Sequence, residues 1–171
     1  MRADAARNRE QIVQAARAVF TQDGPAASLN QVAQRAGVGP GTLYRHFPTL
    51  QDLLVAVIKD DVSALCARGR ELLTGPSPEQ ALRTWLRAVA GHASAMRGLV
   101  ATQLAAVTEG SALAACHDEI TATGAALLAR TGSGLDIADL LKLANAIGWA
   151  GEQAPGDQGL TDRLLALVTL S

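Results

Sequence analysis

The sequence predicts an all-α protein, and three observations support that fold class. Hydrophobic residues make up 49% of the 171 residues but aromatic residues only 3%. Alanine and leucine supply most of the apolar count, a composition that favours helices in close contact. Apolar residues recur every three or four positions, and no segment alternates like a half-buried strand. We therefore expect eight or nine helices.

The most informative segment is SLNQVAQRAGVGPGTLYRHF, residues 28–47, which predicts two short helices joined by a glycine turn. Ser28 and Gln31 have the spacing of a capping box at the start of the first helix. Gly37 stands where that helix ends in a left-handed residue, and Pro40 suits the first position of the second helix. The segment therefore has the pattern of a helix-turn-helix.

The second of these helices has one apolar side and several outward hydrogen-bond donors. Leu43 and Phe47 lie one turn apart and can pack back on the first helix. The other polar side chains point elsewhere: Thr42, Tyr44, Arg45 and His46. A short helix with so many exposed donors contributes little to a core but fits the major groove of DNA.

Longer helices are expected on both sides of this segment. The preceding helix starts near Asn8 and stops at Gly24-Pro25. The following helix opens at Thr49 with Asp52 three residues later and continues to about Leu73. At 1.5 Å per residue it would span roughly 36 Å. It is therefore long enough to connect the N-terminal helices to the rest of the chain and to transmit a movement between them.

Four helices are expected in the rest of the chain, and we allow for a fifth. The first opens at residues 77–80, and the added short helix would cover residues 98–108. The remaining three are expected over residues 111–131, 136–152 and 160–170, separated by the loops TGSG and APGDQG.

Composition and charge limit the class of protein. No run of 18 apolar residues exists, so no membrane span is expected, and the polar N-terminus MRADAARNRE lacks the apolar core of a signal peptide. Cys66 and Cys116 lie in helical patterns and are expected to be buried reduced thiols, because a disulfide would suit an exported protein better. A cytoplasmic location follows as the expectation.

The net charge of −1 is unevenly distributed. Residues 1–46 hold six arginines against three acidic residues, so this part carries +3 and the remainder −4. A basic head on an acidic body fits a protein whose head contacts phosphate groups.

The first 60 residues or so resemble the tetracycline-repressor (TetR) family of bacterial transcriptional regulators. The resemblance runs from the helix REQIVQAARAVFTQDG through the two short helices and into the helix that opens at Thr49. The run AGVGPGTLYRHF is its most specific part, because a glycine turn, a TLY triplet and a His-aromatic pair seldom coincide. The resemblance implies a helix-turn-helix domain over residues 1–50 and an effector-binding and dimerisation domain over residues 51–171.

The resemblance also implies DNA contacts. It assigns DNA-contacting positions to Thr42, Tyr44 and His46, with Gly39, Pro40, Gly41 and Arg45 beside them. Asn30 matches a position that the family can use for base contacts. The alternative is that Tyr44 and His46 only pack against the preceding helix. One departure stands out, because the family usually has lysine or arginine where this chain has Leu50.

A small-molecule cavity in the body is the family's usual effector site. The candidates to line it are Trp85, His92, Met96, Gln103 and His117. Ordinary core packing is the alternative for the tryptophan and methionine, and a surface position for either histidine. His92 and His117 lack partners at metal-ligand spacing, so neither a metal nor another cofactor is expected.

The last two helices resemble the family's dimerisation pair, which forms a four-helix bundle about a two-fold axis. The residues expected at this interface are Ile137, Leu140, Leu141, Ala144, Ile147, Gly148, Leu164, Leu167 and Val168. The alternative is that these stripes belong to the core of a single chain.

Together these features predict a homodimeric transcriptional repressor that binds a palindromic double-stranded DNA operator and is released by a small apolar effector. An enzyme is not expected, because no nucleophile elbow, phosphate loop, HExxH or paired-carboxylate pattern is present. The alternative is a helical ligand- or partner-binding module whose head no longer reads DNA.

Overall fold

The structure of the chain is a computed structural model that describes the backbone of residues 2–103 and 111–168, and the side chains of residues 4–24, 26–97 and 113–168. Eight α-helices and one 3₁₀ turn lie within these ranges, which contain no strand. The elements are α1 (Arg2–Asp23), η1 (Gly24–Ala26), α2 (Leu29–Ala36), α3 (Pro40–His46), α4 (Leu50–Leu72), α5 (Pro78–Gln103), α6 (Ser111–Ala129), α7 (Ile137–Gln153) and α8 (Leu160–Ala166). The all-α prediction is confirmed.

The chain divides into two compact units. The first comprises Met1–Asp60 with Arg97–Ala112, and the second comprises Asp61–Met96 with Leu113–Ser171. Helices α4 and α5 therefore each contribute residues to both units. We call the three-helix part α1–α3 the head, and the second unit the body.

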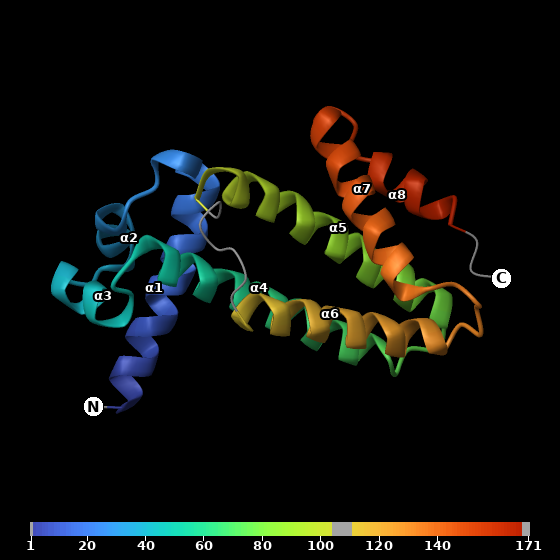
Figure 1. Cartoon of the computed structure of the whole chain (residues 1–171), viewed down its shortest axis with the longest axis horizontal. Coiled ribbons are helices and arrows are strands. Elements are labelled where there is room, and N and C mark those ends of the chain that lie inside the picture. Colours follow the sequence, from blue (N-terminus) through green and yellow to red (C-terminus); the bar gives the residue numbers. More distant parts are fainter. Residues whose placement is uncertain (1, 104–110, 169–171) are drawn as a thin grey trace. The chain divides into compact units, whose positions relative to one another are not determined.

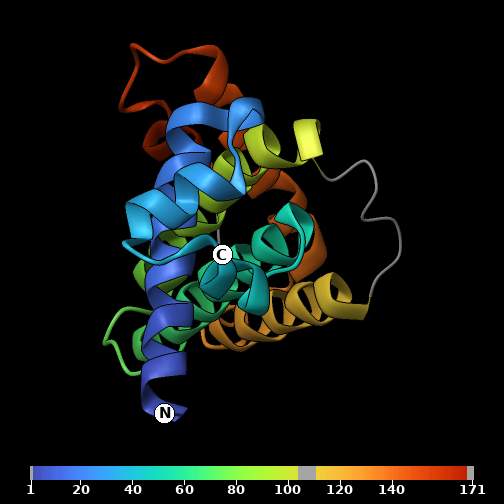
Figure 2. The same cartoon turned by 90° about the vertical axis from the view of Figure 1, so that its left-hand side faces the viewer.

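The head is built around α1, with α2 and α3 packed beside it (Figures 1 and 2). Its buried apolar side chains include the predicted pair Leu43 and Phe47, together with Ile12, Ala16, Val19, Phe20, Val32 and Ala33. Spacing of three and four residues places them on one face of each helix. The start of α4 adds buried Leu53, Leu54 and Val57.

The body has a core drawn from α4, α5, α6, α7 and α8. Its largest fully buried side chain is Trp85 on α5, surrounded by leucines of the other helices. Two arginines there donate to backbone carbonyls at or just beyond the ends of helices, where the regular helical hydrogen bonds stop. Arg83 donates to Leu165 O and Val168 O at 2.7 Å each, and Arg130 donates to Gly75 O at 2.8 Å.

Helix boundaries depart from the sequence-based expectation in three places. Helix α1 begins at Arg2, several residues before the expected start near Asn8. No new helix begins at Gly98, because α5 continues to Gln103, and the rest of the expected helix over residues 98–108 lies outside the described residues. A single glycine inside a run of good helix formers is tolerated at a cost of about 1 kcal/mol. The last helix, α8, ends at Ala166, earlier than expected. Among the described residues, no helix is both long and apolar enough to span a membrane.

Candidate nucleic-acid interface

Helix α2 starts at the predicted capping box. The backbone N–H of Ser28 donates to Gln31 Oε1 at 2.8 Å, and the backbone N–H of Gln31 donates to Ser28 Oγ at 3.4 Å. Ser28 itself is extended, with φ −132° and ψ 154°, as a residue preceding a helix should be. Two amides that would otherwise lack partners are satisfied, so the start of α2 is fixed by local sequence alone.

The turn between α2 and α3 depends on Gly37. This residue is left-handed, with φ 66° and ψ 26°, and its N–H donates to the last turn of α2. The next amide, Val38 N–H, donates to Ala33 O at 3.1 Å, which completes the reversal of the chain. A side chain at position 37 would meet open space, so the requirement for glycine comes from its backbone angle.

Helix α3 is anchored by two apolar side chains. Leu43 is 0% exposed and Phe47, which follows the helix, is 3% exposed. The guanidinium carbon of Arg9 on α1 lies 5.5 Å from the centre of the Phe47 ring, a cation–π contact that ties the two elements together. Because one side of α3 is held in this way, the opposite side is fixed as an outward surface.

The outward surface of α3 carries the residues that the sequence singled out. Tyr44 is 47% exposed, Arg45 is exposed, and Thr42 and His46 are partly buried. Arg45 Nε donates to Gly41 O at 3.0 Å, which holds the side chain along its own helix. Within the described part of the chain, no group accepts from the terminal nitrogens of Arg45. Hydroxyl, imidazole and guanidinium donors therefore gather on one short helix, a set suited to phosphate and base edges.

The remaining head candidates are also accessible. Gly39, Pro40 and Gly41 are exposed at the start of α3, and Asn30 is exposed at the second position of α2. Leu50, where a cation was expected, is the partly buried first residue of α4. Thr49 N–H and Asp52 Oδ2, 3.0 Å apart, form the predicted cap of that helix.

Three residues of α1 that were not predicted as site residues line one hollow with Thr42, Arg45 and His46; they are Asp4, Ala5 and Asn8. The spacing of Asp4 and Asn8 by one helical turn was visible in the sequence. The side of α1 that faces α3 was not, because only the packed structure defines it.

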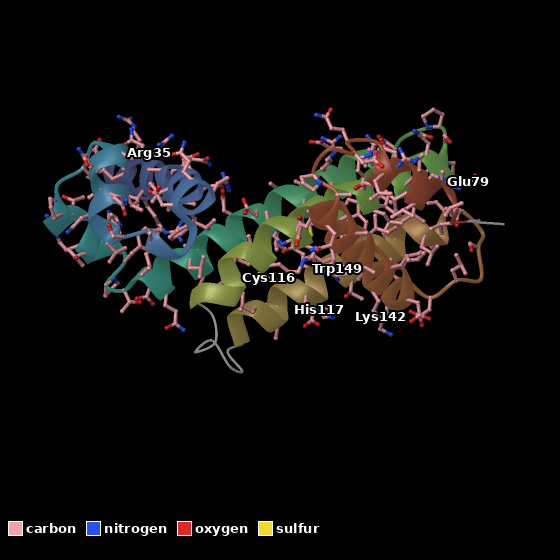
Figure 3. All side chains as sticks on the ribbon, turned by 90° about the horizontal axis from the view of Figure 1, so that it is seen from above. Arg35, Glu79, Cys116, His117, Lys142 and Trp149 are labelled. Atoms are coloured by element: carbon pink, nitrogen blue, oxygen red, sulfur yellow. The ribbon has the colours of Figure 1, made fainter. Side chains whose placement is uncertain are left out.

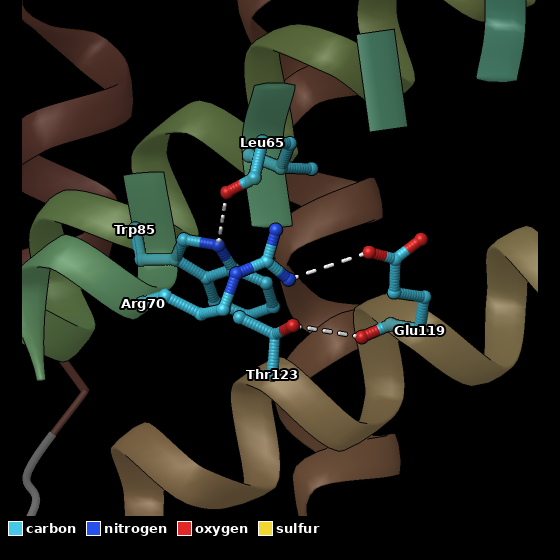
Figure 4. Close-up of polar contacts among 5 residues, drawn as sticks. All are labelled: Leu65, Arg70, Trp85, Glu119 and Thr123. Carbon is cyan, nitrogen blue, oxygen red and sulfur yellow. Dashed lines mark hydrogen bonds and ion pairs between the residues drawn. The ribbon is translucent and has the colours of Figure 1, made fainter. Parts of the chain in front are cut away.

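The effector candidates of the body whose side chains are described differ in burial and in neighbours. Trp85 is 0% exposed and its Nε1 donates to Leu65 O at 3.1 Å (Figure 4). Close contacts surround the indole. A Cβ added at Gly69 would lie 2.9 Å from Trp85 Nε1, and one added at Gly124 would lie 2.8 Å from its Cζ3. In this structure the tryptophan is a core residue, which was the alternative interpretation of its position.

The other effector candidates lie in different surroundings. His92 is half-buried, and burial lowers the pKa of its imidazole while nearby Asp61 opposes that shift. Met96 is partly buried, His117 is exposed on α6, and the side chain of Gln103 lies outside the described residues. Figure 3 shows His117 on the outside of the body, where Lys142 and Trp149 are also exposed.

The expected dimer residues separate into two groups. Leu140, Leu141, Ala144, Ile147 and Gly148 are buried within the chain, and Ala144 is 0% exposed. The surface of α7 and α8 instead presents Leu143 and Leu167, 41% and 75% exposed. A groove of about 590 Å³ runs there, and its lining includes Leu135, Leu143, Ala146, Leu164, Leu167 and Val168. Ala144 has no surface left for a partner, because it is used in the core.

Neither Cys66 nor Cys116, both within the described chain, forms a disulfide. Cys66 is buried, and burial is the main cause that raises the pKa of its thiol. Cys116 is partly buried. A raised pKa keeps the Cys66 thiol protonated and unreactive.

Comparison with known families agrees with this architecture. Residues 12–57 match the family model described as bacterial regulatory proteins, tetR family. Residues 77–170, more than half of the chain, match the model described as the C-terminal domain of SbtR-like transcriptional regulators.

Solved structures with similar folds cover nearly the whole chain. The TetR transcriptional regulator SCO0520 from Streptomyces coelicolor is 31% identical, with a TM-score of 0.77 over 93% of this chain and 94% of that one. A TetR regulatory protein from Mycobacterium vanbaalenii is 29% identical, with a TM-score of 0.59 over 96% of both chains. FadR from Bacillus subtilis, solved with stearoyl-CoA, is 20% identical with a TM-score of 0.64 over 92% of this chain and 96% of that one, which shows a shared fold alone.

Curated relatives match over a shorter region. An HTH-type transcriptional regulator of Staphylococcus aureus is 37% identical over 73 residues, 42% of this chain. The chain spans 40% of the length of that relative.

A helix-turn-helix head and an all-helical body, both matched by family models of transcriptional regulators, define the class as DNA-binding transcriptional regulators. The chain belongs to the TetR family of bacterial regulators.

Proposed function

We propose that this regulator is a homodimeric repressor that binds a palindromic operator through α3 and leaves it when a small apolar effector binds the body. The observation that carries this proposal is the outward surface of α3, where donors stand on a helix anchored by Leu43 and Phe47. Two such helices about a two-fold axis would enter successive major grooves about 34–36 Å apart. This role implies a DNA-binding domain up to about residue 50 and an effector-binding and dimerisation domain after it. It also implies a cytoplasmic location.

The direct test is a mobility shift with the intact protein and DNA from upstream of its own gene. We expect a discrete complex that survives excess random DNA, because base contacts add to the phosphate contacts that every sequence offers. The same fragment with one half of its palindrome scrambled is the matched control and should bind far more weakly. Equal binding to all three DNAs would contradict an operator-reading repressor.

Dimerisation is proposed through the exposed apolar strip of α7 and α8. Leucines exposed by 41–75% around one groove are unusual on the surface of a monomer. Covering them with a second copy would bury the roughly 1,000 Å² or more that a stable interface requires. Leu143→Glu combined with Leu167→Glu should give folded monomers in sedimentation. Ala138→Glu is the control, because Ala138 is exposed on α7 but does not line the groove. A double variant that remains dimeric would place the interface elsewhere.

Release by an effector is proposed to act through α4, because this helix contributes residues to both units. A ligand shifts the equilibrium only if it binds the released state more tightly than the DNA-bound state. Among the described residues, Thr123 is the one buried polar side chain, so a ligand in the core of the body would meet mainly apolar groups, which favours an apolar ligand. A screen of apolar compounds should find molecules that raise the melting temperature and also dissociate the operator complex. Compounds that raise the melting temperature and leave the complex intact would contradict this coupling.

The competing function is a helical ligand- or partner-binding module with a head that no longer reads DNA. Leu50 favours it, because a cation that would meet phosphate is missing at the start of α4. The two functions differ in one measurement. A degenerate head would give no complex with upstream DNA at low salt, whereas the repressor would.

A further inference from the structure

A hollow in the head lies between α3, the proposed recognition helix, and the start of α1. Its volume is about 490 Å³, and Asp4, Ala5 and Asn8 of α1 face Thr42, Arg45 and His46 of α3 across it. The α3 side supplies the donors proposed to hold the DNA backbone. Groups on the α1 side therefore stand within reach of the same strand.

We propose that the DNA interface continues from α3 onto the first turns of α1. There Asn8 donates to a backbone phosphate beside Thr42 and His46, while Asp4 repels phosphate and weakens binding to DNA of any sequence. This inference rests on the proposed role of α3 as the recognition helix. In this proposal Asn8 strengthens DNA binding, whereas Asp4, one helical turn away, weakens it.

Asn8 is suited to a phosphate contact by chemistry and position. Its amide carries two N–H donors, and asparagine is among the side chains that commonly bind DNA phosphates. Asn8 is partly buried beside α3, so its side chain loses less freedom on binding than one on an open surface. Ala5, the residue between Asp4 and Asn8 on this wall, is small and leaves room for a strand.

Asp4 is an exposed carboxylate in a head that otherwise carries a net positive charge. As an acidic residue in the first turn of α1, it also stabilises the helix through the helix dipole. A carboxylate in the same hollow as the phosphate donors adds a repulsion that does not depend on base sequence. Salt screens such a repulsion over about 8–10 Å, so it should be strongest at low ionic strength.

The test uses the full-length protein with the upstream fragment and with random DNA, and measures dissociation constants by fluorescence anisotropy from 50 to 300 mM salt. Asn8→Ala should weaken binding to both DNAs at least about fivefold, because one hydrogen bond is lost in each head of the dimer. The salt dependence should stay the same, because no charge is lost. Asp4→Asn should strengthen binding to both DNAs about threefold at low salt and less at high salt.

Matched controls lie on the same helix beside α2. Gln14→Ala removes an amide and Glu10→Gln removes a negative charge, and both residues line the hollow between α1 and α2 rather than the one beside α3. Each should change the dissociation constant by less than about twofold. Equal effects of target and control variants would overturn the proposal, as would wild-type binding by Asn8→Ala and Asp4→Asn.

Folding and function are separated by two further comparisons. Melting temperatures identify any variant that is unstable, and Asn8→Asp, which keeps the size of the side chain, should weaken binding more than Asn8→Ala because it adds a negative charge. Asn8→Asp with wild-type affinity would overturn the proposal. If Tyr44→Ala weakens binding while both α1 variants behave as wild type, only the extension onto α1 fails. If Tyr44→Ala also binds normally, the recognition helix fails with it.

Discussion

The head and the body encode their structures differently. In the head, residues that are close in sequence fix the geometry: Ser28 with Gln31, Gly37 with the last turn of α2, and Thr49 with Asp52. In the body, distant residues do so, as when Arg83 holds carbonyls more than 80 positions away. Because the contacts that fix the head are local, its geometry can be predicted from the sequence. In the body, the sequence shows which helix faces are apolar, but only the folded structure shows what covers them.

The largest effect expected from this difference is the loss of Trp85. Trp85→Ala should lower the free energy of unfolding by about 3–5 kcal/mol, because it leaves a large cavity and removes the hydrogen bond from the indole Nε1 to Leu65 O. Trp85→Phe keeps part of the ring and should be milder. Urea denaturation followed by circular dichroism measures both. A loss below about 1 kcal/mol for Trp85→Ala would contradict the central place of this residue in the body.

A smaller effect is expected at the glycines of the body. Gly69→Ala would place a methyl group against Thr123 Cγ2 and the Trp85 indole, and should destabilise the protein by about 1–3 kcal/mol. Gly91→Ala is the matched control, because its Cβ would meet open space on α5, and it should stabilise by about 0.5–1 kcal/mol. Equal melting temperatures for the two variants would show that α4 and α5 are not closely packed there.

These two regions also explain what the sequence could predict. The helix-turn-helix and its outward donors were predictable, because caps, glycine turns and spacing are local. Residues of α7 such as Ala144 and Gly148 were expected at a partner interface and lie in the core of the chain. An amphipathic pattern shows that a face is buried, but it does not show which surface covers that face. The same limit applies to Trp85, and to the side of α1 on which Asn8 lies.

The smallest stability effect is expected in the head. Gly37→Ala should destabilise by about 1–2 kcal/mol, because alanine is strained at a φ of 66°. Gly41→Ala, in helical backbone with open space around it, should be neutral or slightly stabilising. Thermal denaturation of both variants checks the pair. If Gly37→Ala is as stable as Gly41→Ala, the turn between α2 and α3 does not require a left-handed residue.

The central claim, that α3 of the head holds DNA, is tested most directly by the affinity of the Tyr44→Ala, His46→Ala double variant for upstream and random DNA at several salt concentrations. We predict at least about a tenfold loss on both DNAs, because two phosphate donors are removed from each head. In the same titration Arg45→Ala should flatten the salt dependence by about one unit per head if its guanidinium meets phosphate. Wild-type affinity of the double variant, with an unchanged melting temperature, would contradict the recognition helix and the repressor proposal with it.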